Sequence, residues 1–467
     1  MRRRSQGLGL GLGLGLALTA CAPPPPVVIV PGPAPEPAEP VVIDAPLPDP
    51  PPMARIALPP RMLGEDAAKV GMDPALLDSI DRVVRIGIRQ GVSPGVALAI
   101  GRHGHLVRLR GYGRLDWNGM LLVTDSTLYD LASLTKVVAT TTAAMILFDE
   151  GALELDARIS SYLPEFGRSA RRDSVRVRNL LTHTAGLPAW KPLYTNEELV
   201  GRANFYRRIA MLALEYSPGT RTEYSDLGMI LMQAIVERIT GMQIEDFLRD
   251  RVFGPLGMTD THYSPLQLAE PRFVSAGTRA GAADEPGERV SPTLEPLLAR
   301  IAPTEYSREM GGKIHGFVHD ENAFAMGGVA GHAGLFSSAR DLAIFAQMLL
   351  NGGLYDGRRI ISERTVRLFT TRQSEQSSRA LGWDTPDENS SAGAYFSAAS
   401  FGHTGFTGTS IWIDPGRDLF VVLLTNRVNP TRSNQLHTPF RRQIHDLAQR
   451  AITDMSVAPR LNAELGY

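Results

Sequence analysis

Cysteine is almost absent from this chain of 467 residues, since Cys21 is the only one. A single cysteine excludes an intramolecular disulfide framework. Lysine is nearly as rare, because only Lys69, Lys136, Lys191 and Lys313 occur among 48 basic residues. Arginine cannot lose its proton in a protein, whereas a desolvated lysine can become a neutral base. Each lysine is therefore a candidate for chemistry.

Clusters of basic residues are also missing. The formal net charge is −1, and the only run of three or more basic residues covers positions 2–4. This excludes the electrostatic footprint of a nucleic-acid partner. The chain has neither the H-E-x-x-H motif of metalloproteases nor the G-x-S-x-G motif of α/β-hydrolases. Its 43% hydrophobic and 21% charged residues suit a globular protein with a substantial core.

The first 21 residues have the three parts of a secretory signal: arginines, a Gly/Leu run and small residues before Cys21. The sequence from Leu18 to Cys21 resembles a bacterial lipobox, which implies that a lipid on Cys21 attaches the chain to a membrane. The alternative is a plain signal peptide cleaved nearby. Ala22 stands where lipoprotein sorting rules place aspartate for inner-membrane retention, so the resemblance implies the outer membrane of the cell envelope, facing the periplasm.

Residues 22–60 are rich in proline and predict a disordered tether. A folded domain is predicted over residues 61–455, with a short tail over 456–467. Asp73 and Pro74 are typical of a helix start, and apolar residues follow at helical spacing. Residues 96–100 and 105–112 predict one hairpin, and residues 409–413 and 419–424 predict a second one. A final helix is expected from Thr438.

Strands near both ends of the domain enclose a middle section, from about Ser133 to Ala380, that is mostly helical in pattern. The sequence therefore predicts an α+β fold, in which distant parts of the chain complete one antiparallel sheet and the middle forms a helical subdomain.

Ser133 and Lys136 stand together at the start of an apolar helical run within residues 128–145. Residues three apart on a helix share a face, so the hydroxyl and the amine are expected to point into the same space. A lysine-activated serine nucleophile needs this geometry. The alternative is that Ser133 only caps the helix.

Two further motifs follow along the chain. Tyr224-Ser225-Asp226 precedes a predicted helix, and Ser225 or Asp226 could simply cap that helix. His403-Thr404-Gly405 opens the first strand of the C-terminal hairpin and could be an ordinary glycine-rich strand entry with an exposed histidine.

In this order the motifs S-L-T-K, Y-S-D and H-T-G resemble those of the penicillin-recognising serine hydrolases, the group of class C β-lactamases, DD-peptidases and related esterases. The similarity extends to LLTHTAGLP from Leu180 and GHTGFTGTSIWIDP from Gly402. It implies the β-lactamase/transpeptidase-like fold. The stretch from Ile314 to Ser337 is most similar to bacterial envelope members of the group.

The resemblance also implies roles. Ser133 is the expected nucleophile, Lys136 its base in a neutral form that burial favours, and Tyr224 the group that moves a proton at the leaving group. His403 and Thr404 are expected to hold a substrate carboxylate, and Gly405 to admit the substrate backbone. The backbone N–H groups of Ser133 and Phe406 are the expected oxyanion hole.

Two positions depart from the usual pattern of β-lactamases. Asp226 stands where asparagine is more common, and His403 stands where lysine is usual. Both changes argue against efficient β-lactam hydrolysis, while acylation by penicillin, peptidase action and esterase action all stay possible.

His315 and His319 are spaced like two zinc ligands on one helix face, but the sequence supplies no third ligand. No metal and no cofactor is therefore predicted, and a loop network is the preferred interpretation. The sequence predicts an envelope serine hydrolase acting on D-alanyl peptides of peptidoglycan or on β-lactams. The alternatives are a carboxylesterase with the same site and a non-catalytic lipoprotein of the same fold.

Overall fold

The computed structural model describes residues 62–460 except for 168, 197–198, 200, 264, 267–294, 309 and 389. The predicted signal peptide with Cys21, the tether over 22–60 and most of the predicted tail lie outside the described residues. Among the described residues, no helix combines the length and the apolar character that a membrane crossing requires.

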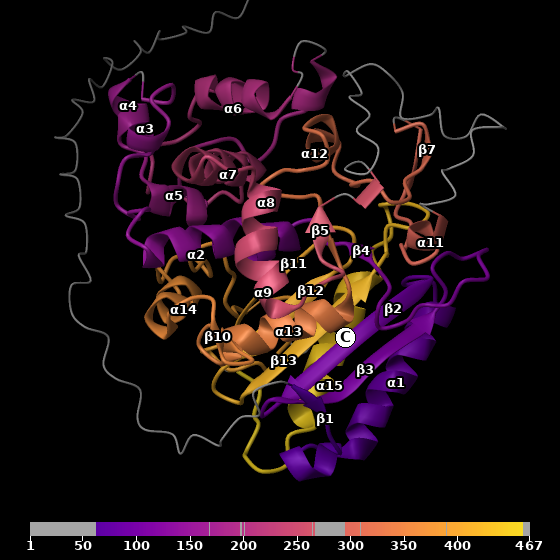
Figure 1. The fold of residues 1–467 in the computed structure, drawn as a ribbon. Coiled ribbons are helices and arrows are strands. Elements are labelled where there is room, and N and C mark those ends of the chain that lie inside the picture. Colours follow the sequence, from indigo (N-terminus) through magenta and orange to yellow (C-terminus); the bar gives the residue numbers. More distant parts are fainter. Residues whose placement is uncertain are drawn as a thin grey trace, which may run out of the picture. The chain divides into compact units, whose positions relative to one another are not determined.

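A six-stranded sheet joins the two ends of the described chain (Figure 1). Its strand order is β1-β3-β2-β13-β12-β11, and β1 pairs with β3 in parallel while all other neighbours are antiparallel. The strands are β1 (Leu63–Gly64), β2 (Gly95–Arg102), β3 (His105–Gly113), β11 (Phe401–Thr404), β12 (Ser410–Asp414) and β13 (Leu419–Thr425). The pairing of β2 with β13 closes the sheet between distant segments, which confirms the predicted α+β fold.

Helices α1 (Pro74–Arg89) and α15 (His437–Arg450) cover one face of this sheet, and α13 (Ala339–Leu350) covers the other (Figure 1). The two faces follow the period of two along each strand. Leu98 and Leu423 pack toward α1 and α15, whereas Ala97 and Leu424 pack into the larger core beneath α13. Asp73 caps α1 as predicted, because its carboxylate accepts the N–H of Ala75.

The remaining elements form the helical region above the sheet. Its larger helices are α2 (Thr142–Asp149), α5 (Val177–Leu181), α6 (Arg202–Met211), α7 (Asp226–Thr240), α8 (Ile244–Leu248), α12 (Glu321–Ala325) and α14 (Glu363–Thr370). Further helices are α3 (Ile159–Tyr162), α4 (Ala170–Asp173), η3 (Leu193–Thr195), η4 (Arg249–Phe253), α9 (Gly254–Leu256) and α11 (Glu295–Leu298), whereas η1 (Ala67–Val70) packs on the side of α1. Small strands are β4 (Tyr129–Asp130), β5 (His262–Tyr263), β6 (Tyr306–Ser307), β7 (Gly312–Lys313), β8 (Leu335–Ser337), β9 (Leu354–Tyr355) and β10 (Arg358–Arg359).

The helical run predicted within residues 128–145 differs from the observed structure at its start. Strand β4 occupies Tyr129–Asp130, a turn follows, and the first helical segment, η2 (Lys136–Thr141), is a π-helix that continues into α2. A π-helix of this kind is rare and is frequently found at functional sites. Ser133 therefore lies in the turn that enters the helix.

Candidate active site

Ser133 is held at the end of a tightly fixed turn. Asp130 accepts the N–H of Ala132 through its side chain, and Ala132 has a positive φ of 46°. The carbonyl groups of Asp130 and Leu131 accept hydrogen bonds from the hydroxyls of Thr407 and Thr409. The turn is thus tied to the segment between β11 and β12, so that the serine and the third motif face one another.

Lys136 has a fully buried side chain, and its ammonium has three acceptors. Its Nζ lies 2.8 Å from Ser133 Oγ, 2.7 Å from Asp226 Oδ1 and 3.2 Å from the carbonyl oxygen of His332. The predicted proximity of Ser133 and Lys136 is confirmed. The ammonium donates hydrogen bonds to Ser133 Oγ and to the His332 carbonyl oxygen, and it forms an ion pair with Asp226.

The charge of Lys136 differs from the sequence-based expectation. Burial alone would lower the pKa of Lys136, but Asp226 and Tyr224 beside it outweigh burial and raise that pKa above its ordinary value. The expectation that burial gives Lys136 a lowered pKa is therefore wrong, because Asp226 forms an ion pair with it that the sequence did not show. The ion pair therefore raises the free-energy cost of removing a proton from Lys136.

Tyr224 lies between two cations. Lys136 Nζ is 4.8 Å and the guanidinium carbon of Arg379 is 5.0 Å from the centre of its ring. The ring is also 4.6 Å from the ring of His183 and 5.9 Å from that of His403. The second motif thus joins the first around Lys136.

The tyrosine motif is anchored by the start of α7. Ser225 is the cap of that helix, since its hydroxyl oxygen accepts the N–H of Gly228 at 3.3 Å. The backbone N–H of Ser225 donates to Nδ1 of His183 at 3.1 Å. Burial lowers the pKa of His183 far below its ordinary value, so the imidazole is neutral and can accept this bond. Ser225 therefore caps α7, as the alternative interpretation held, and it also anchors the motif that carries Tyr224.

The third motif lies on β11 and directly after it. Gly405 must be glycine, because a Cβ atom there would lie 2.1 Å from Thr409 Oγ1 and 2.3 Å from the Leu131 carbonyl oxygen. Phe406 follows with 49% of its surface exposed, and its ring stacks on His319 at 5.7 Å. The close approach at Gly405 brings the strand against the turn that carries Ser133.

His403 is buried, so the alternative of an exposed histidine is wrong. Its Nδ1 lies 2.9 Å from the carbonyl oxygen of Thr404, which can only accept, so Nδ1 carries the proton. Burial and the nearby Arg379 lower the pKa of His403 far below its ordinary value. The neutral ring therefore leaves Nε2 as an acceptor.

A cavity of about 370 Å³ brings these motifs together. It is lined by Ser133, Tyr224, His403, Thr404, Gly405 and Phe406, and also by Arg379, Asp384, Arg427, Asn434, Gln435, His437, Thr438 and Arg441. Lys136 and Asp226 lie behind Ser133 and Tyr224. The structure thus places every catalytic and substrate-binding residue that the sequence predicted in or directly behind one cavity.

Three arginines on the cavity wall were not identified from the sequence. Arg427 and Arg441 donate to backbone carbonyl groups, and neither has a carboxylate partner within 4.0 Å among the described residues. Arg379 has only Asp384, at 4.0 Å. The described wall of the cavity is therefore positively charged. Arginine is so common in this chain that the sequence offered no signal to single these three out.

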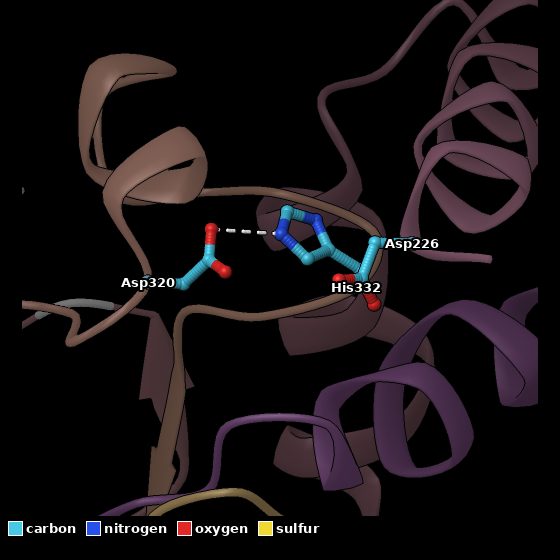
Figure 2. Close-up of side chains that lie close together, drawn as sticks. All are labelled: Asp226, Asp320 and His332. Atoms are coloured by element: carbon cyan, nitrogen blue, oxygen red, sulfur yellow. Dashed lines mark hydrogen bonds and ion pairs between the residues drawn. The ribbon is translucent and has the colours of Figure 1, made fainter. Parts of the chain in front are cut away.

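The histidines considered as zinc ligands have separate partners. His315 Nε2 lies 2.9 Å from the Ile301 carbonyl oxygen, whereas His319 Nε2 lies 2.9 Å from Glu305. A different trio, Asp226, Asp320 and His332, has atoms suited to a metal within 4.8 Å of one another (Figure 2). Lys136 already places its ammonium against Asp226, so a cation is present at this trio.

A model of the Beta-lactamase family matches residues 80–446 of this chain. The chain belongs to the Beta-lactamase family. This match covers part of helix α1, five of the six strands of the sheet and all three motifs, and it confirms the resemblance identified from the motifs.

Among the members of the family, a protein of Escherichia coli K12 named "Putative D-alanyl-D-alanine carboxypeptidase" is 33% identical over 387 residues, covering 77% of this chain and 84% of that protein. The solved structure of a penicillin-binding protein homologue from Caulobacter crescentus has a TM-score of 0.60 at 20% identity and covers 82% of this chain and 99% of its own. The structure of EstCE1, a hydrolase with promiscuous acyltransferase activity, has a TM-score of 0.61 at 20% identity and covers 80% and 98%. The two structures show the shared β-lactamase-like fold, and the family supports a serine hydrolase.

Proposed function

We propose that this protein is a serine hydrolase that forms an acyl-enzyme on Ser133 and acts on D-alanyl peptides of peptidoglycan. The observation that carries the proposal is the 2.8 Å contact between Lys136 Nζ and Ser133 Oγ at the wall of the cavity. The E. coli relative's name agrees with this substrate class.

The proton of Ser133 needs an acceptor, and the resting ammonium of Lys136 cannot be one. We assign this role to Lys136 and Tyr224 together, in the form of the site that holds one proton fewer. Ser133 Oγ then attacks the substrate carbonyl, its proton moves to this pair, and the pair returns a proton to the leaving amine. A water molecule then attacks the acyl group through the same proton transfers and releases it from Ser133. At the end of the cycle, Ser133 is free again and the pair of Lys136 and Tyr224 holds the same number of protons as at the start.

The oxyanion that forms during each attack needs two donors. We assign the backbone N–H groups of Ser133 and Phe406 to it, each worth roughly 3 kcal/mol of transition-state stabilisation. The hydroxyls of Thr407 and Thr409, bonded to the turn before Ser133, hold these two backbone segments side by side.

The positive cavity wall supports a substrate with a carboxylate. A cation without a partner is costly at a partly buried site, and a substrate anion would compensate it. We assign the carboxylate to Arg379, Arg427 and Arg441. His403 is less suited than the sequence suggested, because its free Nε2 is an acceptor and would repel a carboxylate. Thr404 and Gly405 remain available to bind the substrate backbone.

This assignment separates a peptidase from a carboxylesterase that uses the same nucleophile. The test compares hydrolysis of an acyl-D-Ala-D-Ala peptide, the same peptide with a terminal amide, nitrocefin and a neutral p-nitrophenyl ester. A peptidase is expected to have its highest kcat/KM on the free-acid peptide. A higher kcat/KM on the neutral ester, with no preference for the free acid, would favour the esterase instead.

We further propose that a lipid on Cys21 holds the protein in the bacterial outer membrane, facing the periplasm. The proposal rests on the lipobox-like sequence before Cys21 and on Ala22 after it. Cys21→Ser is expected to move the protein from the membrane fraction to the soluble periplasmic fraction. Unchanged fractionation of this variant would count against lipidation.

A further inference from the structure

The side chains of Asp226, Asp320 and His332 come from separate segments and lie close together (Figure 2). Asp226 begins α7, Asp320 precedes α12, and His332 lies in the loop before β8. His332 Nε2 lies 2.8 Å from Asp320 Oδ1, as the dashed line in Figure 2 marks. His332 is buried, with 1% of its surface exposed, whereas the side chain of Asp320 is 22% exposed.

The backbone around His332 is fixed from two sides. The carbonyl oxygen of Gly331 accepts the hydroxyl of Thr140 from η2 at 2.7 Å. A Cβ atom at Gly331 would lie 2.2 Å from the carbonyl oxygen of Met229 in α7, so only glycine fits there. The next carbonyl group, that of His332, is an acceptor of Lys136 Nζ. Small rotations of this peptide would therefore move an acceptor of the ammonium.

Asp320 holds the side chain of His332, the residue whose carbonyl group contacts Lys136. Its Oδ1 also accepts the N–H of Ala323 at 2.8 Å, which caps α12. Burial would raise the pKa of Asp320, but His332 and Lys136 help to hold that pKa well below its ordinary value. Asp320 is thus a second carboxylate, after Asp226, whose negative charge acts on Lys136.

We propose that Asp320 and His332 are positioning residues for acyl transfer at Ser133. The hydrogen bond between them orients the His332 carbonyl group, and the charge of Asp320 adds to that of Asp226, so that the Lys136 ammonium is held against Ser133 Oγ. This inference rests on the proposed function, because Lys136 needs such positioning only if Ser133 reacts.

A bound metal ion is the competing use of the same trio. Asp226, Asp320 and His332 together could supply oxygen and nitrogen ligands. The ammonium of Lys136 already lies 2.7 Å from Asp226, and His332 Nε2 is already bonded to Asp320. A metal would have to displace both contacts. The existing contacts therefore favour positioning of the lysine.

The pH dependence of the site involves every charged or titratable group near Lys136. These groups are Tyr224, Asp226, Asp320, His332, His183, His403 and Arg379. Among them, Asp320 can be changed without altering a group that lines the cavity.

The experiment compares His332→Ala, His332→Gln and Asp320→Asn with wild type on a p-nitrophenyl ester. His332→Ala is expected to lower kcat about tenfold or more with little change in KM, because the lysine is misplaced while the cavity is intact. His332→Gln keeps an N–H that can donate to Asp320 and should recover most of kcat. Asp320→Asn keeps an acceptor but removes a negative charge, which should move the acid limb of the kcat profile to lower pH by about one unit.

Two matched controls measure the effect of losing a histidine or a helix cap elsewhere. His315→Ala removes an imidazole in the segment before α12 that bonds the backbone carbonyl group of Ile301, and Asp73→Ala removes the cap of α1. Both controls should keep the wild-type kcat and pH profile. A loss of kcat in His315→Ala equal to that in His332→Ala would overturn the proposal, since general destabilisation would then explain both.

The proposal also fails if His332→Ala and Asp320→Asn fold, by near-ultraviolet circular dichroism, and keep the wild-type kcat and pH profile. It fails in favour of a metal site if purified wild type holds stoichiometric zinc that His332→Ala lacks, or if chelation abolishes its activity. Ser133→Ala separates this inference from the proposed function. Full activity of Ser133→Ala would refute the proposed function itself, whereas an inactive Ser133→Ala beside normal His332 and Asp320 variants would refute only the positioning role.

Discussion

Asp226 Oδ1 lies 2.7 Å from Lys136 Nζ, so a buried lysine has a carboxylate partner directly behind Ser133. Related β-lactamases more often have asparagine at the position of Asp226, and an amide would leave the ammonium without a formal counter-charge. The ion pair stabilises the protonated form of Lys136. In the proposed mechanism, this ion pair is therefore expected to set the pH at which the site can accept the proton of Ser133.

The first prediction concerns Asp226→Asn. Loss of the carboxylate leaves burial as the largest influence on Lys136, so the pKa of Lys136 should fall. The active form, which holds one proton fewer, is then reached at lower pH. The acid limb of kcat/KM should move to lower pH by about one to two units, measured on a p-nitrophenyl ester between pH 5 and 10.

Asp125→Asn is a suitable control for the Asp226 variant, because Asp125 pairs with Arg340 at the surface. It should leave the profile unchanged. An acid limb of Asp226→Asn that coincides with that of wild type would show that the ion pair does not control the reactive protonation state.

The second prediction concerns Arg379→Gln. If the arginines bind the terminal carboxylate, loss of one charge-assisted hydrogen bond should raise KM for acyl-D-Ala-D-Ala about tenfold or more. The KM for the same peptide with a terminal amide should change little, because that peptide presents no negative charge to Arg379. Steady-state kinetics on the two peptides measure both effects.

Arg372→Gln is the matched control for Arg379→Gln. Arg372 lies in the same segment but donates to Thr385 and Pro386, away from the residues that line the cavity. It should leave KM for both peptides unchanged. An equal loss on the acid and the amide in Arg379→Gln would exclude carboxylate recognition by this residue.

The third prediction concerns stability and Asp341, which is buried near the start of α13. Burial raises the pKa of Asp341 to about 6, above the ordinary 3.8, although Thr261 and the backbone N–H of Asp260 donate to it. The folded state thus binds this proton more tightly than the unfolded state. Its contribution to stability is present below about pH 4 and is lost as the pH rises to about 6, a change of up to roughly 3 kcal/mol.

Asp341→Asn keeps a neutral acceptor and does not ionise. Relative to wild type, the variant should gain thermal stability between pH 4.5 and pH 7.5, because only wild type has to bury a charge at the higher pH. The difference in Tm between the two proteins at each pH isolates this group from all others. A constant difference in Tm across that range would contradict the raised pKa of Asp341.

Much of the fold could be predicted from local sequence. The helix over residues 74–89, both hairpins and the final helix each have their own periodicity and turn residues, and the structure confirms them. The π-helix at Lys136 could not be predicted, because its apolar residues are also compatible with an ordinary α-helix. Its form depends on tertiary contacts such as those of Lys136 with the His332 carbonyl group and of Thr140 with that of Gly331.

The motif residues of the site could be predicted because their order along the chain is distinctive. The protonation of Lys136 could not, since it depends on a contact with Asp226 across 90 residues of sequence. The arginines of the cavity and the pair of Asp320 with His332 lack any local signal, because each depends on segments that meet only in the folded chain.

Intact mass spectrometry after incubation with benzylpenicillin tests acylation of Ser133 most directly. Wild type is expected to gain one penicilloyl group, because Ser133 Oγ opens the β-lactam ring and the adduct keeps every atom of the penicillin. Ser133→Ala, which lacks that oxygen, should keep its own mass under the same conditions. An adduct retained by folded Ser133→Ala would contradict Ser133 as the nucleophile.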